Sequence, residues 1–209
     1  MKSFNNKHIG LKKNELSFLT SLSTPPKIQH AIDALPQNFE EKGDSCMSVR
    51  AVLREGRAHC IEGALLAALA LWVHGERPLL MDLSASKEDD DHVIALFKRN
   101  GLWGAFSKSN HAVLGYRDPI YRTLRELALS YAHEYFNKSG SKTLRAYSRP
   151  YLLTCRPTAS WITGEEAWVI AEDLCEIPHT KLFTNKQAAL LRPIDSFEQH
   201  LHRTTRYVK

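Results

Sequence analysis

The sequence lacks the usual marks of exported, membrane-spanning and zinc-binding proteins. Its most apolar run, residues 64–73, is far shorter than the roughly eighteen residues that a membrane span needs. The N-terminus has neither the apolar segment nor the small-residue cleavage site of a secretory signal, so we expect a cytoplasmic protein with no membrane partner. Cys46, Cys60, Cys155 and Cys175 form no CxxC pair and no zinc-like spacing, which favours reduced thiols.

Runs of basic residues are also missing. The chain has 28 Lys and Arg against 23 Asp and Glu, but the basic residues are scattered along it. Without a basic run or interleaved aromatics, the pattern argues against a nucleic-acid partner. Asp89, Asp90 and Asp91 are adjacent, and such neighbouring carboxylates are usually solvated, so we predict no metal site. Nothing in the sequence indicates a cofactor or an oligomeric state.

The pattern along the chain predicts a flexible basic N-terminal arm, residues 1–24, and a single domain, residues 25–209. At 209 residues and 43% hydrophobic, the chain can bury a core of its own. Apolar spacing and capping signals predict helices near residues 27–35, 48–54, 59–74, 123–136 and 165–176. The helix over 59–74 is apolar on nearly every side, so it should be buried on most sides.

Short apolar runs at 78–83, 92–97 and 102–106 predict strands. Asn100-Gly101 lies between two of them and predicts a hairpin. We expect a further run, 111–116, to extend the sheet before Asp118-Pro119 breaks it. This order of elements predicts an α+β fold, in which a central helix packs on an antiparallel sheet with flanking helices.

Cys60 stands at the start of the predicted central helix. The N–H groups of a first helical turn are unpaired, and their partial positive charge stabilises a thiolate. A thiol pKa can fall there from about 8.5 to roughly 3.5–7.5 when a cation also helps. The same N–H groups can bind an oxyanion. The alternative is that Cys60 is a small buried residue that begins a hydrophobic helix.

His92 opens the strand that leads into the hairpin. A histidine at that point can reach a thiol on a helix packed against the sheet, and can then transfer protons to and from it. The alternative is an exposed histidine that closes the acidic stretch. Two neighbours of the site are interpreted more simply. His59 adjoins Cys60 and could line the cleft, although adjacent helical side chains do not face each other. Lys108 could add positive charge near the cleft, but we expect it on the surface.

Together these residues resemble the transglutaminase-like superfamily, which has a papain-type fold. The resemblance rests on Cys60 and the CIEGA segment 60–64, on His92 before a hairpin, and on the GLWG segment 101–104. It covers about residues 55–120. In that family a cysteine opens the core helix, a histidine follows on a strand, and an aspartate stands on the next strand. The resemblance implies that Cys60 is a nucleophile and His92 its base.

The third position departs from that pattern, because Ser107 stands where the family carries aspartate, four residues after Trp103. Strand parity across the hairpin also places Ser107 or Ser109 opposite His92. A serine hydroxyl can orient the imidazole, but it cannot stabilise imidazolium as a negative charge does. The alternatives for this position are Asn110, Asp118 and Asp82.

We therefore predict a cysteine enzyme that acts on an amide or peptide bond through a thioester, as a hydrolase or an acyltransferase. Its substrate would be a protein or peptide amide. Cys60 would attack the carbonyl, His92 would act as base and then as acid, and Ser107 would orient His92. The alternative, which Ser107 favours, is a non-catalytic transglutaminase-like domain used for binding or as a scaffold.

Overall fold

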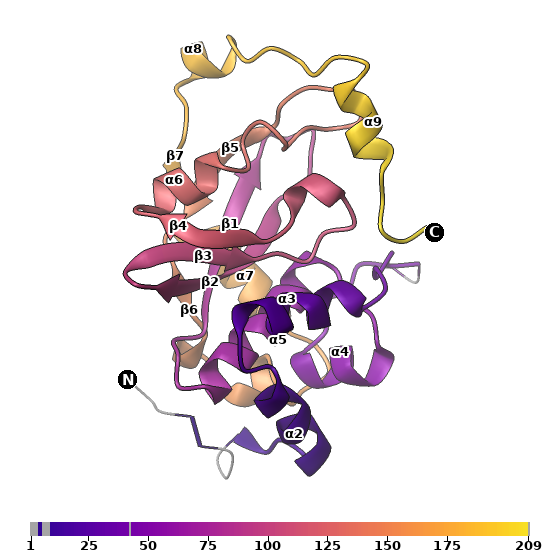
Figure 1. Cartoon of the computed structure of the whole chain (residues 1–209), viewed down its shortest axis with the longest axis vertical. Helices are drawn as coiled ribbons and strands as arrows, with labels where there is room; N and C mark the ends of the chain where they lie inside the picture. The colour runs from indigo at the N-terminus through magenta and orange to yellow at the C-terminus, as the bar shows by residue number, and fades with distance from the viewer. Residues whose placement is uncertain (1–3, 6–8, 42, 209) are drawn as a thin grey trace.

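The computed structural model describes residues 4–5, 9–41 and 43–208, and of residues 201–203 only the backbone. In this part of the chain, seven strands form one sheet, and β6 (Tyr151–Leu152) pairs with β1 (Leu79–Ala85). The order of the other strands is β4 (Arg117–Tyr121), β3 (Leu102–Phe106), β2 (His92–Arg99), β1, β5 (Leu144–Ser148) and β7 (His179–Lys181). Every pairing between these strands is antiparallel. Helices flank the sheet (Figure 1). The predicted α+β class, a helix packed on an antiparallel sheet with flanking helices, is confirmed.

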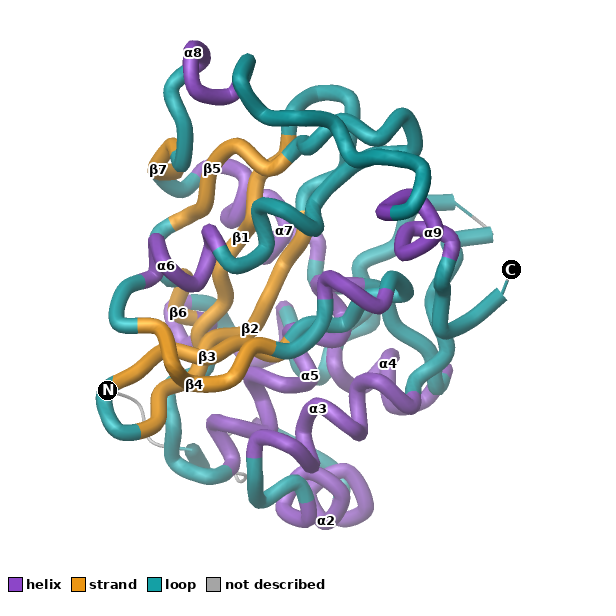
Figure 2. Tube along the Cα trace, turned by 45° about the horizontal axis from the view of Figure 1, so that its top comes forward, coloured by secondary structure: helices purple, strands orange, loops and turns teal. Residues whose placement is uncertain are grey.

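Helix α5 (Cys60–Val73) is the centre of the larger apolar core. Every residue from Ile61 to Trp72 is buried, as its all-round apolar sequence predicts. It packs against strands β1 (Leu79–Ala85) and β2 (His92–Arg99). Helices α2 (Lys13–Ser21), α3 (Pro25–Ala34) and α4 (Val49–Glu55) surround it, and Figure 2 shows these helices grouped below the strands. Among the described residues, no helix combines the length and apolar character that crossing a membrane requires.

The predicted hairpin is present between β2 and β3 (Leu102–Phe106). Asn100 and Gly101 both have positive φ, at 52° and 82°, as a two-residue hairpin turn with the twist of a sheet requires. The ladder runs from the pair Arg99–Leu102 to the pair Ala95–Phe106. Beyond this last pair the chain leaves the ladder, close to where β2 begins.

The prediction for residues 111–118 was wrong. Residues Ala112–Leu114 form a 3₁₀ turn, η1, and the next strand, β4, is Arg117–Tyr121. It therefore contains Asp118 and Pro119, which we expected to end the sheet. The reason is position, because β4 stands at one end of the strand order. An edge strand tolerates proline, since the missing N–H faces away from the sheet.

A second apolar core lies on the other face of the sheet, between strand residues such as Met81 and Ile94 and helix α6 (Leu124–Leu129). Helix α6 ends earlier than the predicted residue 136, and the turns after it bury Tyr131 and Tyr135. The remaining elements are β5 (Leu144–Ser148), β6 (Tyr151–Leu152), β7 (His179–Lys181), α8 (Asn185–Ala188) and α9 (Glu198–Arg203), with two 3₁₀ turns at Leu153–Cys155 and Thr158–Ser160.

Helix α7 (Trp168–Glu176) begins three residues later than predicted. The backbone just before it is used elsewhere. Ser48 N–H donates to the carbonyl of Glu165, and Ala167 N–H donates to the carbonyl of Cys46. Residues 165–167 thus pair with the segment that leads into α4, instead of joining the helix.

The N-terminal region also differs from the prediction of a loose arm over 1–24. Residues 1–3 and 6–8 of that arm lie outside the described residues. Lys13–Ser21, however, form helix α2, and its Leu19 is fully buried in the larger core. An ion pair of 2.9 Å between Glu15 and Arg50 connects α2 to α4. Because this segment is mostly polar, the buried face of α2 was not apparent from the sequence.

Candidate active site

Cys60 is the first residue of α5 and is partly exposed. It lines a cavity of about 500 Å³ together with His59, His92 and Lys108. The N–H groups of its helical turn have no partner within the helix and point outward at this end. The cavity therefore brings together a thiol, two imidazoles and backbone donors, as predicted for Cys60 and His92.

His92 and Ser107 form the contact that the sequence predicted. The His92 Nε2 atom lies 2.7 Å from the Ser107 hydroxyl oxygen, and both residues are buried. The same hydroxyl donates a short hydrogen bond to the carbonyl of Leu114. A serine hydroxyl has one proton, and a carbonyl only accepts, so Ser107 must accept from His92. His92 Nε2 therefore carries a proton, and its Nδ1 remains for Cys60.

Helix α3 holds Ser107 in place through one side chain. Gln29 accepts from the Ser107 backbone N–H at 3.2 Å and donates to the Ser107 carbonyl at 2.9 Å. Its Nε2 also donates to Asp33 at 2.9 Å, which fixes the orientation of the amide. Ser107 itself is 0% exposed. The hydroxyl that contacts His92 is thus held from both its backbone and its side chain.

The thiol of Cys60 is strongly acidic in this setting. Burial raises its pKa, but hydrogen bonds from His59 and His92 outweigh burial and lower the pKa of Cys60 to about 5. Cys46 provides the contrast, because burial and the nearby charge of Glu62 raise its pKa to about 12. Of these two cysteines, only Cys60 is a thiolate at neutral pH.

The alternatives for the third residue lie elsewhere. The Asn110 side chain exchanges hydrogen bonds with the backbone of Tyr207, at 3.0 and 2.8 Å. Asp118 is exposed on β4. Asp82 is buried and lies 2.9 Å from Nε2 of His179, in a second acid–histidine pair on β1 and β7. Among the candidates named from the sequence, Ser107 is the one whose side chain bonds to His92.

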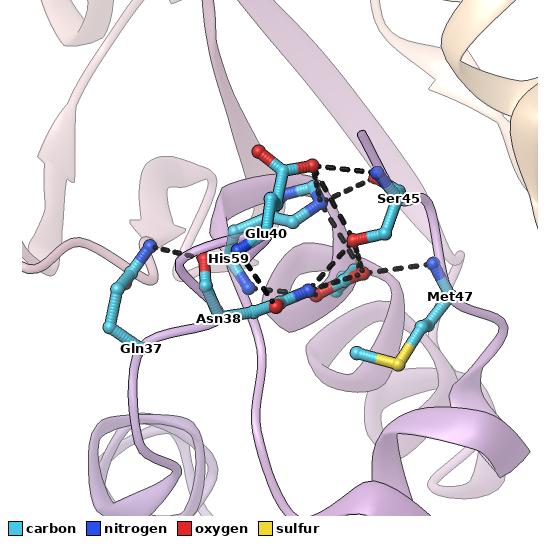
Figure 3. Close-up of polar contacts among 7 residues, drawn as sticks. Gln37, Asn38, Glu40, Ser45, Met47 and His59 are labelled. Carbon is cyan, nitrogen blue, oxygen red and sulfur yellow. Dashed lines mark hydrogen bonds and ion pairs between the residues drawn. The ribbon is translucent and has the colours of Figure 1, made fainter. Parts of the chain in front are cut away.

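His59 lines the cavity, and the argument from helix geometry does not apply to it. It is the N-cap of α5 and has extended backbone angles (φ −101°, ψ −167°), so its side chain does not follow the helix. Its Nε2 lies 2.8 Å from the Ser45 carbonyl, 3.3 Å from Glu62 and 3.7 Å from Glu40. Figure 3 shows the His59 ring beside Glu40 and Ser45. The possible signal was Glu62, three residues after His59, the spacing of a capping box.

Lys108 is buried and not on the surface, with only 1% of its area exposed. Its Nζ donates to the carbonyl of Leu35 at 2.6 Å, and burial lowers the pKa of Lys108 to about 8. The side chain passes close to Gly63 of α5, where a Cβ would lie 2.4 Å from the Cβ of Lys108. A glycine in the first turn of a helix otherwise rich in Ala and Leu was the signal for this close approach.

Two carboxylates of the acidic stretch accept hydrogen bonds from other parts of the chain. Asp91 accepts from the N–H of Ala85 at 2.7 Å, and Asp89 accepts from the hydroxyl of Thr143. Within the described part of the chain, no group of three or more His, Cys, Asp or Glu side chains is arranged to hold a metal ion. The cavity beside this stretch brings together the thiol of Cys60 and the imidazoles of His59 and His92.

Neither a protein-family model nor the sequence of a curated protein matches this chain.

Proposed function

We propose that this protein is a cysteine enzyme of the transglutaminase-like kind, which acts on a protein or peptide amide through a thioester. One observation carries the proposal: Cys60, with its lowered pKa, meets an imidazole whose other nitrogen is held by a buried hydroxyl. A structural cysteine at the start of a buried helix needs neither feature. Perturbed thiol pKa values of this kind are typical of nucleophiles.

The first half-reaction forms the thioester. The Cys60 thiolate attacks the amide carbonyl carbon, and the carbonyl oxygen takes the negative charge. The unpaired N–H groups of the first turn of α5 stabilise that oxyanion. The bond between carbon and nitrogen then breaks, and His92 delivers a proton to the leaving amine. Ser107 keeps His92 turned so that its Nδ1 is the atom that transfers the proton.

The second half-reaction releases the acyl group. A water molecule or an amine attacks the thioester, and His92 removes its proton. The bond between carbon and sulfur breaks, and Cys60 leaves as the thiolate. Attack by water gives a carboxylic acid, and attack by an amine gives a new amide. Both outcomes use the same three side chains.

Acylation by a simple activated ester tests the proposal without knowledge of the natural substrate. We expect p-nitrophenyl acetate to give a burst of p-nitrophenolate close to one equivalent, with the acetyl group on Cys60 by peptide mass spectrometry. Cys60→Ala and His92→Ala should both abolish the burst. The exposed thiol of Cys155, which the ester can also acetylate, serves as the internal control. Acetylation of Cys60 no faster than that of Cys155 would refute the proposal.

Blocked glutaminyl and asparaginyl peptides then separate the two outcomes. Ammonia release without added amine indicates hydrolysis. Incorporation of hydroxylamine, with a faster release of ammonia, indicates acyl transfer to an amine. Both readouts should disappear in Cys60→Ala.

A second candidate function, a non-catalytic binding domain, is favoured by the same serine. Ser107 is neutral and contributes no charge to an imidazolium at His92. In that case Cys60 would react with iodoacetamide but would form no acyl-enzyme, so the burst experiment distinguishes the two functions.

A further inference from the structure

Among the ion pairs of the described residues, a buried carboxylate pairs with His59 and none pairs with His92. Glu62 is 0% exposed and lies in the first turn of α5. Its oxygens accept from the backbone N–H groups of His59 at 2.8 Å and Met47 at 2.9 Å, and from the amide of Asn38 at 3.2 Å. Each of these groups can only donate here, as the neighbours of an ionised carboxylate do. A buried carboxylate in this state needs a positive partner.

The partner is His59. Its Nε2 lies 2.8 Å from the Ser45 carbonyl, which can only accept, so this nitrogen carries a proton. The same nitrogen is 3.3 Å from Glu62. The ring also has a hydrogen bond to Cys60. A ring with a carbonyl at one nitrogen and a thiolate as its other partner is best satisfied when both nitrogens are protonated.

The direction in which the pKa of His59 is shifted agrees with a doubly protonated ring. Burial lowers the pKa of His59, but the hydrogen bond and charge of Cys60, the charge of Glu62 and the Ser45 carbonyl together raise it to about 9. His59 is therefore a cation up to about pH 9, and between about pH 5 and pH 9 it lies beside a Cys60 thiolate.

We propose that His59, charged and held by Glu62, is the cation that keeps Cys60 as a thiolate, so that His92 remains free to move protons. The inference rests on the proposed function and assigns its two tasks to two histidines. As the pH rises through about 5, the sulfur of Cys60 releases its proton to water while His59 keeps its own, so a thiol beside an imidazolium becomes a thiolate beside an imidazolium. Glu62 acts through His59 and is a positioning residue.

This division explains why a serine suffices at position 107. In a single-histidine site the imidazolium must persist beside the thiolate, and a carboxylate on the far nitrogen stabilises it. If the positive charge is on His59, the carboxylate belongs on His59, where Glu62 lies. Ser107 then needs only to orient the ring that transfers protons.

Other ionisable groups that face Cys60 do not compete for its proton near pH 6. Burial is the main cause that raises each of their pKa values, and the charge of Cys60 adds to it. The resulting pKa is about 12 for Cys46, about 7 for Asp82 and well above its usual range for Tyr135. Cys46 and Tyr135 are therefore protonated at pH 6 and place no further charge beside Cys60.

The test is the rate of Cys60 alkylation by iodoacetamide from pH 4 to pH 9, read by peptide mass spectrometry. In the wild type we expect the rate to rise with an apparent pKa of about 5. His59→Gln should move the midpoint upward by at least about one pH unit, as loss of an adjacent opposite charge does. A shift of two units corresponds to a fall of about tenfold in rate at pH 6. Glu62→Gln should move the midpoint in the same direction.

Three further variants separate the tasks of the residues. His59→Arg keeps the charge and should retain most of the low midpoint. His92→Gln should abolish the acyl-enzyme burst but move the alkylation midpoint less than His59→Gln does. His30→Gln, at an exposed histidine of α3, is the matched control and should change neither readout.

A measurement on the unaltered protein covers the case in which a variant does not fold. Long-range ¹H–¹⁵N spectra of the histidine rings should show His59 with both nitrogens protonated at pH 7. A neutral His59, or a His92→Gln midpoint that rises while that of His59→Gln stays at the wild-type value, would overturn the inference. The proposed function would survive that result if the burst on Cys60 remained. A burst that is absent from the wild type would remove both.

Discussion

Ser107→Ala is the substitution whose effects follow most directly from the geometry. It removes one oxygen that accepts from His92 Nε2 at 2.7 Å and donates to the carbonyl of Leu114. The Gln29 contacts are with the backbone of residue 107, so they persist in the variant. The change therefore leaves a ring N–H and a carbonyl without these partners, at a position where the serine side chain is fully buried.

The cost can be worked out for stability and for reaction rate. Each unpaired buried group costs about 1–3 kcal/mol, so the free energy of unfolding should fall by about 2 kcal/mol or more. The His92 ring would no longer be fixed in rotation or tautomer. A positioned general base contributes about 10²–10⁴-fold, and we expect Ser107→Ala to lose at least about tenfold of that in Cys60 acylation.

Ser148→Ala is a matched control for this experiment. Ser148 is also 0% exposed, and its hydroxyl accepts from the N–H of Asp82 at 2.9 Å and donates to the carbonyl of Arg149 at 3.0 Å. It has the same number of hydrogen bonds as Ser107 but does not touch His92. Urea denaturation should show a similar loss of stability in both variants, and the burst rate with p-nitrophenyl acetate should fall only in Ser107→Ala. Equal burst rates in the two variants would show that Ser107 does not orient the catalytic base.

Three other outcomes are expected. At pH 6, iodoacetamide should modify Cys60 rapidly and leave Cys46 unmodified in the folded protein, because their pKa values are about 5 and about 12. Peptide mass spectrometry measures both rates, with urea-unfolded protein as the control. Equal rates for the two cysteines in the folded protein would contradict the prediction. Gly63→Ala should lower the free energy of unfolding, measured with urea, by about 1–3 kcal/mol, because the new Cβ would lie 2.4 Å from the Cβ of Lys108. The same substitution in a helix with free space around the glycine stabilises the protein. Between about pH 5 and pH 6.5 the stability of the wild type should rise relative to that of Cys60→Ser, because over that range the unfolded wild type holds the Cys60 proton and the folded state does not. The comparison is needed because the raised pKa of Asp82 gives the opposite slope in both proteins. Above pH 6.5 the raised pKa of His59 also gives the opposite slope, so the relative gain should level off, as urea unfolding at each pH would show.

The features that the sequence predicted well are those set by local pattern. The all-apolar run 64–73 could only be a buried helix, and it is the centre of α5. Asn100-Gly101 has the backbone freedom for a two-residue turn, which fixed the β2–β3 hairpin and with it the parity of His92 and Ser107. The contact between Cys60, His92 and Ser107 follows from one helix start and one hairpin.

The features that were missed depend on contacts between distant segments. Glu62 is satisfied by Asn38, Ser45 and Met47, which lie on a loop whose course no periodicity reveals. The start of α7 was misplaced because residues 165–167 pair with the backbone of residues 46–48. In each case the deciding partner is many residues away, and local propensity carries no information about it.

The error over residues 111–116 has a direct bearing on the chemistry. A strand there would have carried the backbone straight along the edge of the sheet. The 3₁₀ turn η1 instead brings the Leu114 carbonyl to the hydroxyl of Ser107. The side chain at 107 therefore has to accept from His92 and donate to Leu114 at once, and an ionised aspartate can only accept. An aspartate at this position would face the carbonyl oxygen with a second acceptor, in a place that is fully buried. The serine is thus the residue that this turn requires, and the negative charge that a transglutaminase-like aspartate would supply has to come from another part of the site.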